Sequence, residues 1–150
     1  MDCLVHSLSL NMTLAEKVGE RLSEVDRRLI TLLGFELVAM GVGTATAQMR
    51  VREDMVNWHG FCQGGLIFSL ADHAFAYACM SQNMAGVTLS ADIIFNNPAR
   101  LGDLISAEAT VLVDKGRTAT CDVVVRNQDD VTIAHYRGIS YRTRQSVLPD

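Results

Sequence analysis

The chain has 150 residues, of which 49% are hydrophobic and 20% are charged, a balance typical of a globular domain. This length suits a single domain with one hydrophobic core. The formal net charge of −4 argues against a nucleic-acid-binding protein, because such a protein concentrates basic residues on one face.

The cysteines and the chain's N-terminal region indicate a reducing compartment. The four cysteines are Cys3, Cys62, Cys79 and Cys121, and none forms a CxxC pair. Such scattered thiols are expected to stay reduced, and together with His59 and His73 they match no common zinc spacing. The first ten residues lack the basic start of a secretion signal, and no apolar run is long enough to span a bilayer. We therefore expect a cytoplasmic protein with no metal and no membrane segment.

A first helix is predicted over residues 13–33. Thr13 and Glu16 have the spacing of a capping box, in which each side chain satisfies a free amide of the first turn. Gly34 can adopt the positive φ that often ends a helix. Apolar residues recur at steps of three or four and predict one buried stripe: Leu14, Val18, Leu22, Val25, Leu29 and Leu32.

The rest of the chain predicts a second helix and six strands. Residues 35–51 indicate a hairpin of two strands, and residues 64–82 indicate a helix that is apolar on nearly every side and so buried all round. Four strands are expected at 87–95, 103–114, 118–127 and 131–142, and their short connections favour an antiparallel meander. The predicted architecture is α+β, with one long buried helix wrapped by a curved antiparallel sheet.

Asp72 is the anomalous residue of the second helix. A carboxylate buried in an apolar helix is costly, so it finds partners, changes its pKa or serves a function. The alternative is that Asp72 lies on one exposed stripe of the helix, beside Ser69 or His73.

Gly64 and Gly65 begin the same helix. Free backbone amides and the positive end of the helix dipole point outward there, and glycines let a ligand approach closely. Such an amide could polarise a thioester carbonyl and stabilise the oxyanion that forms on attack. The alternative is an ordinary glycine turn.

Two segments together resemble the PaaI-type (phenylacetate-degradation) thioesterases, which have the hotdog fold. They are NWHGFCQGG over residues 57–65 and IFSLADHAFAYAC over residues 67–79. The likeness covers about residues 35–142. It implies hydrolysis of an acyl- or aryl-CoA thioester to a free acid and coenzyme A, with coenzyme A as part of the substrate and no separate cofactor.

The resemblance also implies roles for particular residues. In that family the helical carboxylate activates water or attacks the thioester carbon, and Asp72 occupies its position. In the family a backbone amide binds the oxyanion, and Gly64 occupies its position. Asn57 matches the family asparagine that contributes a side-chain hydrogen bond in the site. Ser90 falls where related thioesterases carry a hydroxyl that orients water. Because such sites are shared between subunits, the resemblance implies a homodimer or homotetramer.

One residue departs from the family pattern, because Gln63 stands where the family has histidine. Glutamine donates and accepts hydrogen bonds but cannot carry a charge. His59 could substitute for the missing histidine. The remaining predicted substrate contacts are Gly65 near the carbonyl, Phe75 in an acyl pocket, and Arg100, Lys115 and Arg117 on the coenzyme A phosphates.

Two other functions fit the same fold. A non-hydrolytic acyl-CoA-binding or sensing protein would keep Gly64 and Gly65 but would not need Asp72. A dehydratase would use a histidine base, and Gln63 in place of histidine counts against it. The joint presence of Asp72, Asn57 and Ser90 favours the thioesterase.

Overall fold

The computed structural model describes residues 12–149, so Cys3 and the predictions for residues 1–10 lie outside the described residues. The helical elements in chain order are α2 (Leu14–Val25), α3 (Arg27–Leu33), a short 3-10 turn (Glu53–Met55) and α4 (Gly64–Met80). The strands are β1 (Phe35–Gly41), β2 (Thr44–Arg50), β3 (Met84–Phe95), β4 (Leu104–Lys115), β5 (Thr118–Arg126) and β6 (Thr132–Ser146). No helix in this part of the chain is long and apolar enough to cross a membrane.

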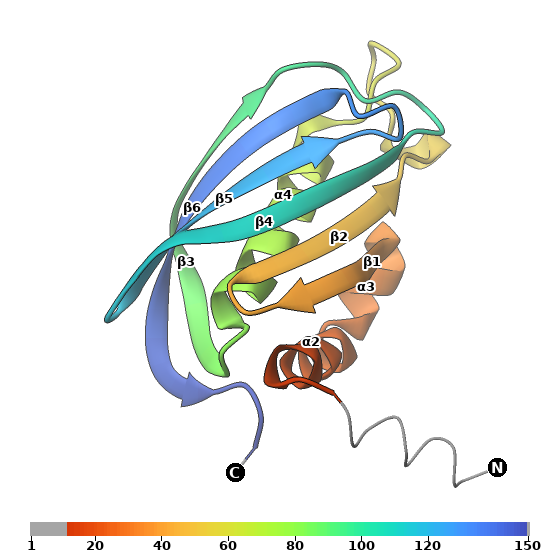
Figure 1. Ribbon diagram of the computed structural model, residues 1–150. Coiled ribbons are helices and arrows are strands. Elements are labelled where there is room, and N and C mark those ends of the chain that lie inside the picture. The colour runs from red at the N-terminus through yellow and green to blue at the C-terminus, as the bar shows by residue number, and fades with distance from the viewer. Residues whose placement is uncertain (1–11, 150) are drawn as a thin grey trace, which may run out of the picture.

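The six strands form one antiparallel sheet in the order β1-β2-β4-β5-β6-β3, curved around α4 (Figure 1). The predicted α+β hotdog architecture is confirmed. The predicted four-strand meander is wrong in one respect, because β3 pairs with β6 and not with β4. After β3, residues 96–103 carry the chain across the end of the sheet, so β4 can pair with β2 instead.

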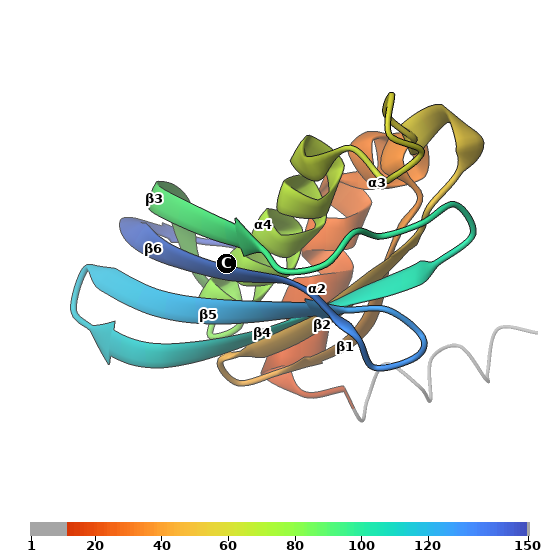
Figure 2. The ribbon, with the colours of Figure 1, turned by 90° about the horizontal axis from the view of Figure 1, so that it is seen from above.

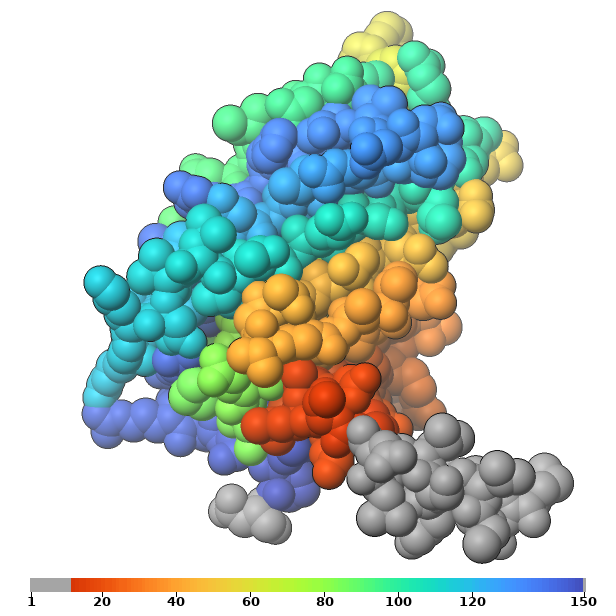
Figure 3. Space-filling model, in the orientation of Figure 1, coloured from red at the N-terminus to blue at the C-terminus, as the bar shows by residue number. Residues whose placement is uncertain are grey.

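The helices lie together on one side of the sheet (Figure 2). The strands cover the opposite side, as the space-filling view shows (Figure 3). Alanines on α4 allow this close approach: Ala71, Ala74 and Ala78 are almost completely buried. The inner faces of the strands contribute alternate buried residues, as in Ala119, Cys121, Val123 and Val125 of β5.

The prediction that the second helix is buried on every side is wrong. One stripe of α4 is only partly buried, and it includes Phe68, Ser69, Asp72, Ala76 and Met80. These positions recur at steps of three or four residues, so they share one face of the helix. The strands cover the other faces. Asp72 therefore lies on the one side of α4 that the sheet leaves open.

The first helix has the predicted extent and capping box but is interrupted at Asp26. Its predicted apolar stripe is only partly buried, because Val18 lies in the core and Leu22 packs against it, whereas Leu14 and Leu32 are largely exposed. The buried face contains Ala15, Val18 and Gly19. A Cβ at position 19 would meet Met40 of β1 at 2.6 Å, so the small residue lets α2 lie close against β1.

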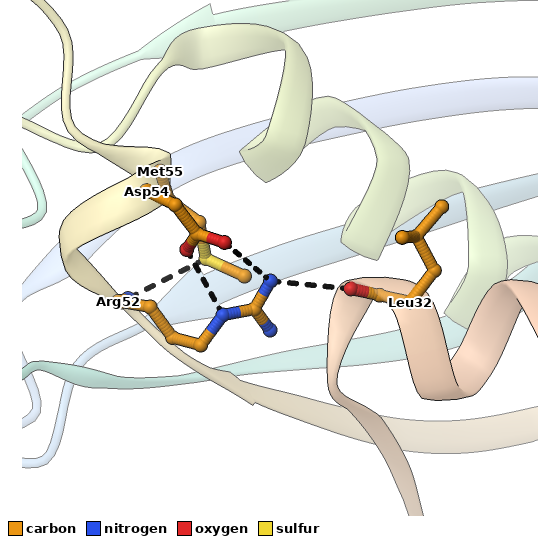
Figure 4. A network of polar contacts seen from close by, with 4 residues as sticks. All are labelled: Leu32, Arg52, Asp54 and Met55. Atoms are coloured by element: carbon orange, nitrogen blue, oxygen red, sulfur yellow. Dashed lines mark hydrogen bonds and ion pairs between the residues drawn. The ribbon is translucent and has the colours of Figure 1, made fainter.

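Arg52 joins the end of α3 to the turn that leads into the 57–63 loop (Figure 4). Its guanidinium donates to the Leu32 carbonyl oxygen at 3.1 Å and to Asp54 Oδ1 at 3.0 Å. The Leu32 carbonyl is one of the last four of α3, which have no partner within the helix. The same guanidinium lowers the pKa of the Asp54 carboxyl. Arg52 thus fixes the N-terminal helices to the segment that precedes α4.

We expect Arg52→Ala to lower the free energy of unfolding by about 1 kcal/mol, because the Leu32 carbonyl at the end of α3 loses its hydrogen-bond donor. The melting temperature should fall by about 2–4 °C, measured by circular dichroism. Arg21→Ala is the matched control. Arg21 is similarly exposed and is also paired with a carboxylate, Glu24, but only within its own helix. An equal loss in both variants would contradict a tertiary role for Arg52.

Candidate active site

Asp72 lies near the middle of α4 and its carboxylate is held by two strands. Tyr136 of β6 donates its hydroxyl to Asp72 Oδ1 at 2.6 Å. Thr88 of β3 donates to the same oxygen at 3.3 Å. Within residues 12–149, Oδ2 accepts no hydrogen bond. The carboxylate therefore has one fixed oxygen and one oxygen available to a reactant.

The Asp72 face of α4 borders a hollow of about 320 Å³, which we call the Asp72 hollow. Its walls come from α3, β1 and α4, and are mainly apolar: Leu29, Leu33, Phe35, Phe68 and Met80. This volume is at the lower end of the range for small-molecule sites. The arrangement places a carboxylate at the side of an apolar cavity.

The start of α4 presents a free amide at Gly64. The Gln63 side chain caps the helix by accepting a hydrogen bond from the Gly65 amide at 2.6 Å. Among the described residues, the Gly64 amide makes no hydrogen bond. A Cβ at position 64 would lie 3.0 Å from the Phe95 ring, so a side chain there would press against the ring and shift it slightly. The site therefore offers one backbone donor at the positive end of a helix dipole.

A second hollow, of about 300 Å³, lies at this end of α4 and includes Asn57, Cys62 and Gly64 in its lining. Asn57 Oδ1 accepts hydrogen bonds from the amides of His59 at 2.9 Å and Phe61 at 3.2 Å. The carboxamide oxygen of Asn57 therefore holds the 57–61 loop in shape. We call this second cavity the Gly64 hollow.

The two hollows cannot serve one carbonyl group within a single chain. Asp72 follows Gly64 by eight residues on a continuous helix, which places them about 12 Å apart along the axis at about 1.5 Å per residue. A base and an oxyanion donor must both lie within about 3 Å of the reacting groups. We call the surroundings of Asp72 and of Gly64 the two candidate half-sites of the chain.

Some predicted site residues lie away from Asp72. Ser90 pairs across the sheet with Ile139, on the opposite face from Thr88, because a register shift separates Thr88 from Ser90. The hydroxyl in contact with Asp72 is that of Thr88. Phe75 is buried in the core, 1% exposed, and is not part of the lining of the Asp72 hollow.

The predicted phosphate-binding residues are also separated from one another. Arg100 lies beside the Gly64 hollow, with its guanidinium 5.2 Å from the centre of the Phe61 ring. Lys115 and Arg117 lie at the β4–β5 turn, and Arg117 donates to the Tyr141 hydroxyl at 2.9 Å. The length of β4 separates the two groups by about 35 Å at about 3.3 Å per residue. A single chain cannot bring all three to one phosphate group.

Two further ionisable side chains near the half-sites are neutral at pH 7. Burial raises the pKa of Cys62 to about 11, which leaves a thiol and not a nucleophilic thiolate beside Gly64. Burial also lowers the pKa of His73, against the opposing effect of Asp26 and Asp72. Nowhere in residues 12–149 do three His, Cys, Asp or Glu side chains cluster as metal ligands.

Sequence reasoning missed Tyr136 and Thr88 as partners of Asp72. Tyr136 is an inward position of an alternating strand, and this pattern alone predicts a core tyrosine. Thr88 was missed because the register shift in β3 cannot be recognised from the sequence. The contacts arise only when β3 and β6 pair and curve around α4.

Comparisons with known proteins identify the family and the fold of the chain. Residues 59–134 match the family model described as the thioesterase superfamily. The chain is 42% identical over 110 residues, 73% of this chain and 79% of the relative, to "Acyl-coenzyme A thioesterase PaaI" of Escherichia coli. The solved structure of the E. coli PaaI protein from the phenylacetic acid degradation operon superposes with a TM-score of 0.84 at 35% identity, over 89% of this chain and 99% of that one.

A second similar protein has been solved with a ligand. A Streptococcus mutans protein bound to acetyl-CoA superposes with a TM-score of 0.72 at 27% identity, over 75% of this chain and 90% of that one. The matched family model, the extent of identity with the E. coli thioesterase and the shared architecture lead to one conclusion. The chain belongs to the thioesterase superfamily and is a thioester hydrolase with the hotdog fold.

Proposed function

We propose that the protein hydrolyses acyl-CoA thioesters, with Asp72 as the catalytic carboxylate and the Gly64 amide as the oxyanion donor. The observation that carries this proposal is the carboxylate with one fixed and one free oxygen beside an apolar hollow. The E. coli thioesterase and the acetyl-CoA-bound S. mutans protein support a coenzyme A thioester as the substrate.

The chemistry requires Asp72 to be ionised. As a general base, Asp72 accepts a proton from water while the water oxygen attacks the thioester carbon. The carbonyl oxygen becomes an oxyanion, which the Gly64 amide stabilises. The intermediate then collapses, the carbon–sulfur bond breaks, and the coenzyme A sulfur takes the proton from Asp72. Direct attack by Asp72 would need the same ionised state and the same oxyanion donor.

The substrate's acyl group would occupy the Asp72 hollow, whose apolar walls suit a hydrocarbon or an aromatic ring. The coenzyme A portion would extend toward the Gly64 half-site of a second copy of the chain, where that copy's Arg100 offers a positive charge. This orientation places the thioester carbonyl between a carboxylate and a helix N-terminus.

The active enzyme would be a homodimer or a larger homo-oligomer, because the half-sites of one chain are about 12 Å apart. A second copy could bring its Gly64 to the first copy's Asp72. The β3 edge supports this assembly, since it is an unpaired edge of twelve residues with exposed Val87, Leu89 and Ile94. Edge strands of this kind pair readily with another chain.

Asp72→Asn should reduce kcat by about 10²–10⁴-fold, because it keeps the side-chain shape and removes the base. Binding of acyl-CoA, measured by calorimetry on the same samples, should be retained. A variant that hydrolyses its best thioester at the wild-type rate would refute the role of Asp72. If wild type binds acyl-CoA tightly but hydrolyses none of a panel of thioesters, the protein is a sensor.

Gly64→Pro should reduce kcat by about 10²–10³-fold, since it removes the oxyanion donor. Proline is well tolerated here because position 64 is the first of the helix and Gln63 has the extended backbone that precedes proline, with ψ 129°. Gly64→Ala is the matched control, because it adds a similar contact with Phe95 but keeps the amide hydrogen. Equal losses in both variants would show that packing, and not the amide, matters.

The shared site can be tested by co-expressing Asp72→Asn and Gly64→Pro chains. In a mixed dimer, one site would combine the intact Asp72 of one chain with the intact Gly64 of the other. Random pairing makes half of the dimers mixed, so activity should return to about one quarter of wild type. A mixture no more active than either variant alone would exclude a site shared in this way.

Gln63 tests the one departure from the family pattern. Gln63→Ala should lower both activity and melting temperature, because the Gly65 amide loses its cap, at a cost of about 1 kcal/mol. Gln63→His should retain or raise thioesterase activity, since an imidazole nitrogen can also accept this hydrogen bond. Steady-state hydrolysis and thermal melting of both variants provide the measurements. Inactivity of the histidine variant alone would mean that the loop depends on glutamine.

A further inference from the structure

Tyr136 makes the shortest hydrogen bond to Asp72, and its hydroxyl has no other partner among the described residues. The tyrosine is 2% exposed, and its hydroxyl lies 2.6 Å from Asp72 Oδ1. A hydroxyl-to-carboxylate bond of this length is charge-assisted and stronger than a neutral hydrogen bond. Such an interaction can hold the carboxylate in one orientation.

Two rings and a glycine fix the position of the Tyr136 phenol. The Phe68 ring meets it edge-on at a centroid distance of 5.3 Å, and the Phe75 ring lies at 5.5 Å. Gly138, two residues further along β6, leaves room for Phe75, since a Cβ there would lie 2.6 Å from Phe75 Cε2. The phenol therefore cannot swing away without displacing the core.

A buried phenol at this position is not required to fill the core. Phenylalanine would provide the same ring without a hydroxyl, whose burial costs free energy unless it is hydrogen-bonded. Asp72 is the acceptor that offsets this cost. Burial, together with the hydrogen bond to Asp72, raises the pKa of Tyr136 far above its usual value, so the hydroxyl stays a donor across the working pH range.

Thr88 adds a second, longer bond to the same oxygen of Asp72, at 3.3 Å. Both donors therefore act on Oδ1, and neither acts on Oδ2. A carboxylate held through one oxygen keeps its other oxygen free and pointed in one direction. This asymmetry is the arrangement that a general base or a nucleophile needs.

We infer that Tyr136 is a positioning residue of the active site, which holds the ionised Asp72 through Oδ1 so that Oδ2 meets the reactant. This inference rests on the proposed role of Asp72. Tyr136 itself gives up no proton and touches no substrate atom. Its contribution to catalysis passes entirely through Asp72.

The first test is Tyr136→Phe, which removes only the hydroxyl. We expect kcat to fall by about 10–10²-fold, the effect of a slightly misplaced catalytic group, with KM and acyl-CoA binding changed by less than about twofold. Ser140→Ala is the matched control. It also removes a buried hydroxyl from the inner face of β6, 4% exposed, and should leave kcat at the wild-type level.

Thr88→Val gives a second measurement at an exposed position, where folding is not at risk. It removes the longer of the two bonds and should therefore cost less in kcat than Tyr136→Phe. Wild-type kcat in Tyr136→Phe, or an equal loss in Ser140→Ala, would overturn the inference.

A double-mutant cycle separates positioning from a general structural effect. If Tyr136 acts only through Asp72, then adding Tyr136→Phe to Asp72→Asn should cost almost nothing more in kcat. Losses that multiply would overturn the inference. If Asp72→Asn is inactive but Tyr136→Phe is fully active, the inference about Tyr136 is wrong and the proposed role of Asp72 stands. A fully active Asp72→Asn rejects the proposed catalytic mechanism itself.

Discussion

Both chemical groups of the candidate active site are carried by one rigid helix, and the length of that helix separates them. Gly64 and Asp72 are eight residues apart on α4, about 12 Å along its axis. A helix cannot shorten, so one chain cannot direct both groups at one carbonyl. This constraint explains why the two hollows are distinct, and why we propose an active site that is completed by a second copy of the chain.

The packing of α4 decides which of its residues can react. Small residues such as Ala71, Ala74 and Ala78 let the curved sheet enclose most of the helix. The sheet leaves one stripe less covered, and Asp72 lies on it. The same sheet supplies Tyr136 and Thr88, which fix the carboxylate. The strands therefore have two effects on α4. They bury most of the helix, and they also hold the carboxylate of Asp72 on its less covered face.

Gln63 caps the start of α4 with a neutral side chain, at the position where the family motif has histidine. Its carboxamide oxygen caps α4 at the Gly65 amide, so the adjacent Gly64 amide is left free. The cap needs no positive charge, and glutamine can fill it. The Asn57 oxygen serves a similar purpose by ordering the 57–61 loop through two backbone amides. Both side chains therefore shape the backbone around the Gly64 amide, the proposed oxyanion donor.

The sequence alone determined most of the elements and the α+β hotdog architecture, and it singled out Asp72 and Gly64 as candidate site residues, because periodicity, helix-end chemistry and family motifs are local features of the chain. It did not determine that β3 pairs with the far side of β6, that Leu14 and Leu32 of the predicted stripe are exposed, or that Thr88 and not Ser90 meets Asp72. These outcomes depend on strand order, on one register shift and on which helix faces can approach a strand closely. Tyr136 is the clearest case. In the sequence it is one apolar position of an alternating strand, and only the curvature of the sheet around α4 brings its hydroxyl, 64 residues away along the chain, to the carboxylate it holds.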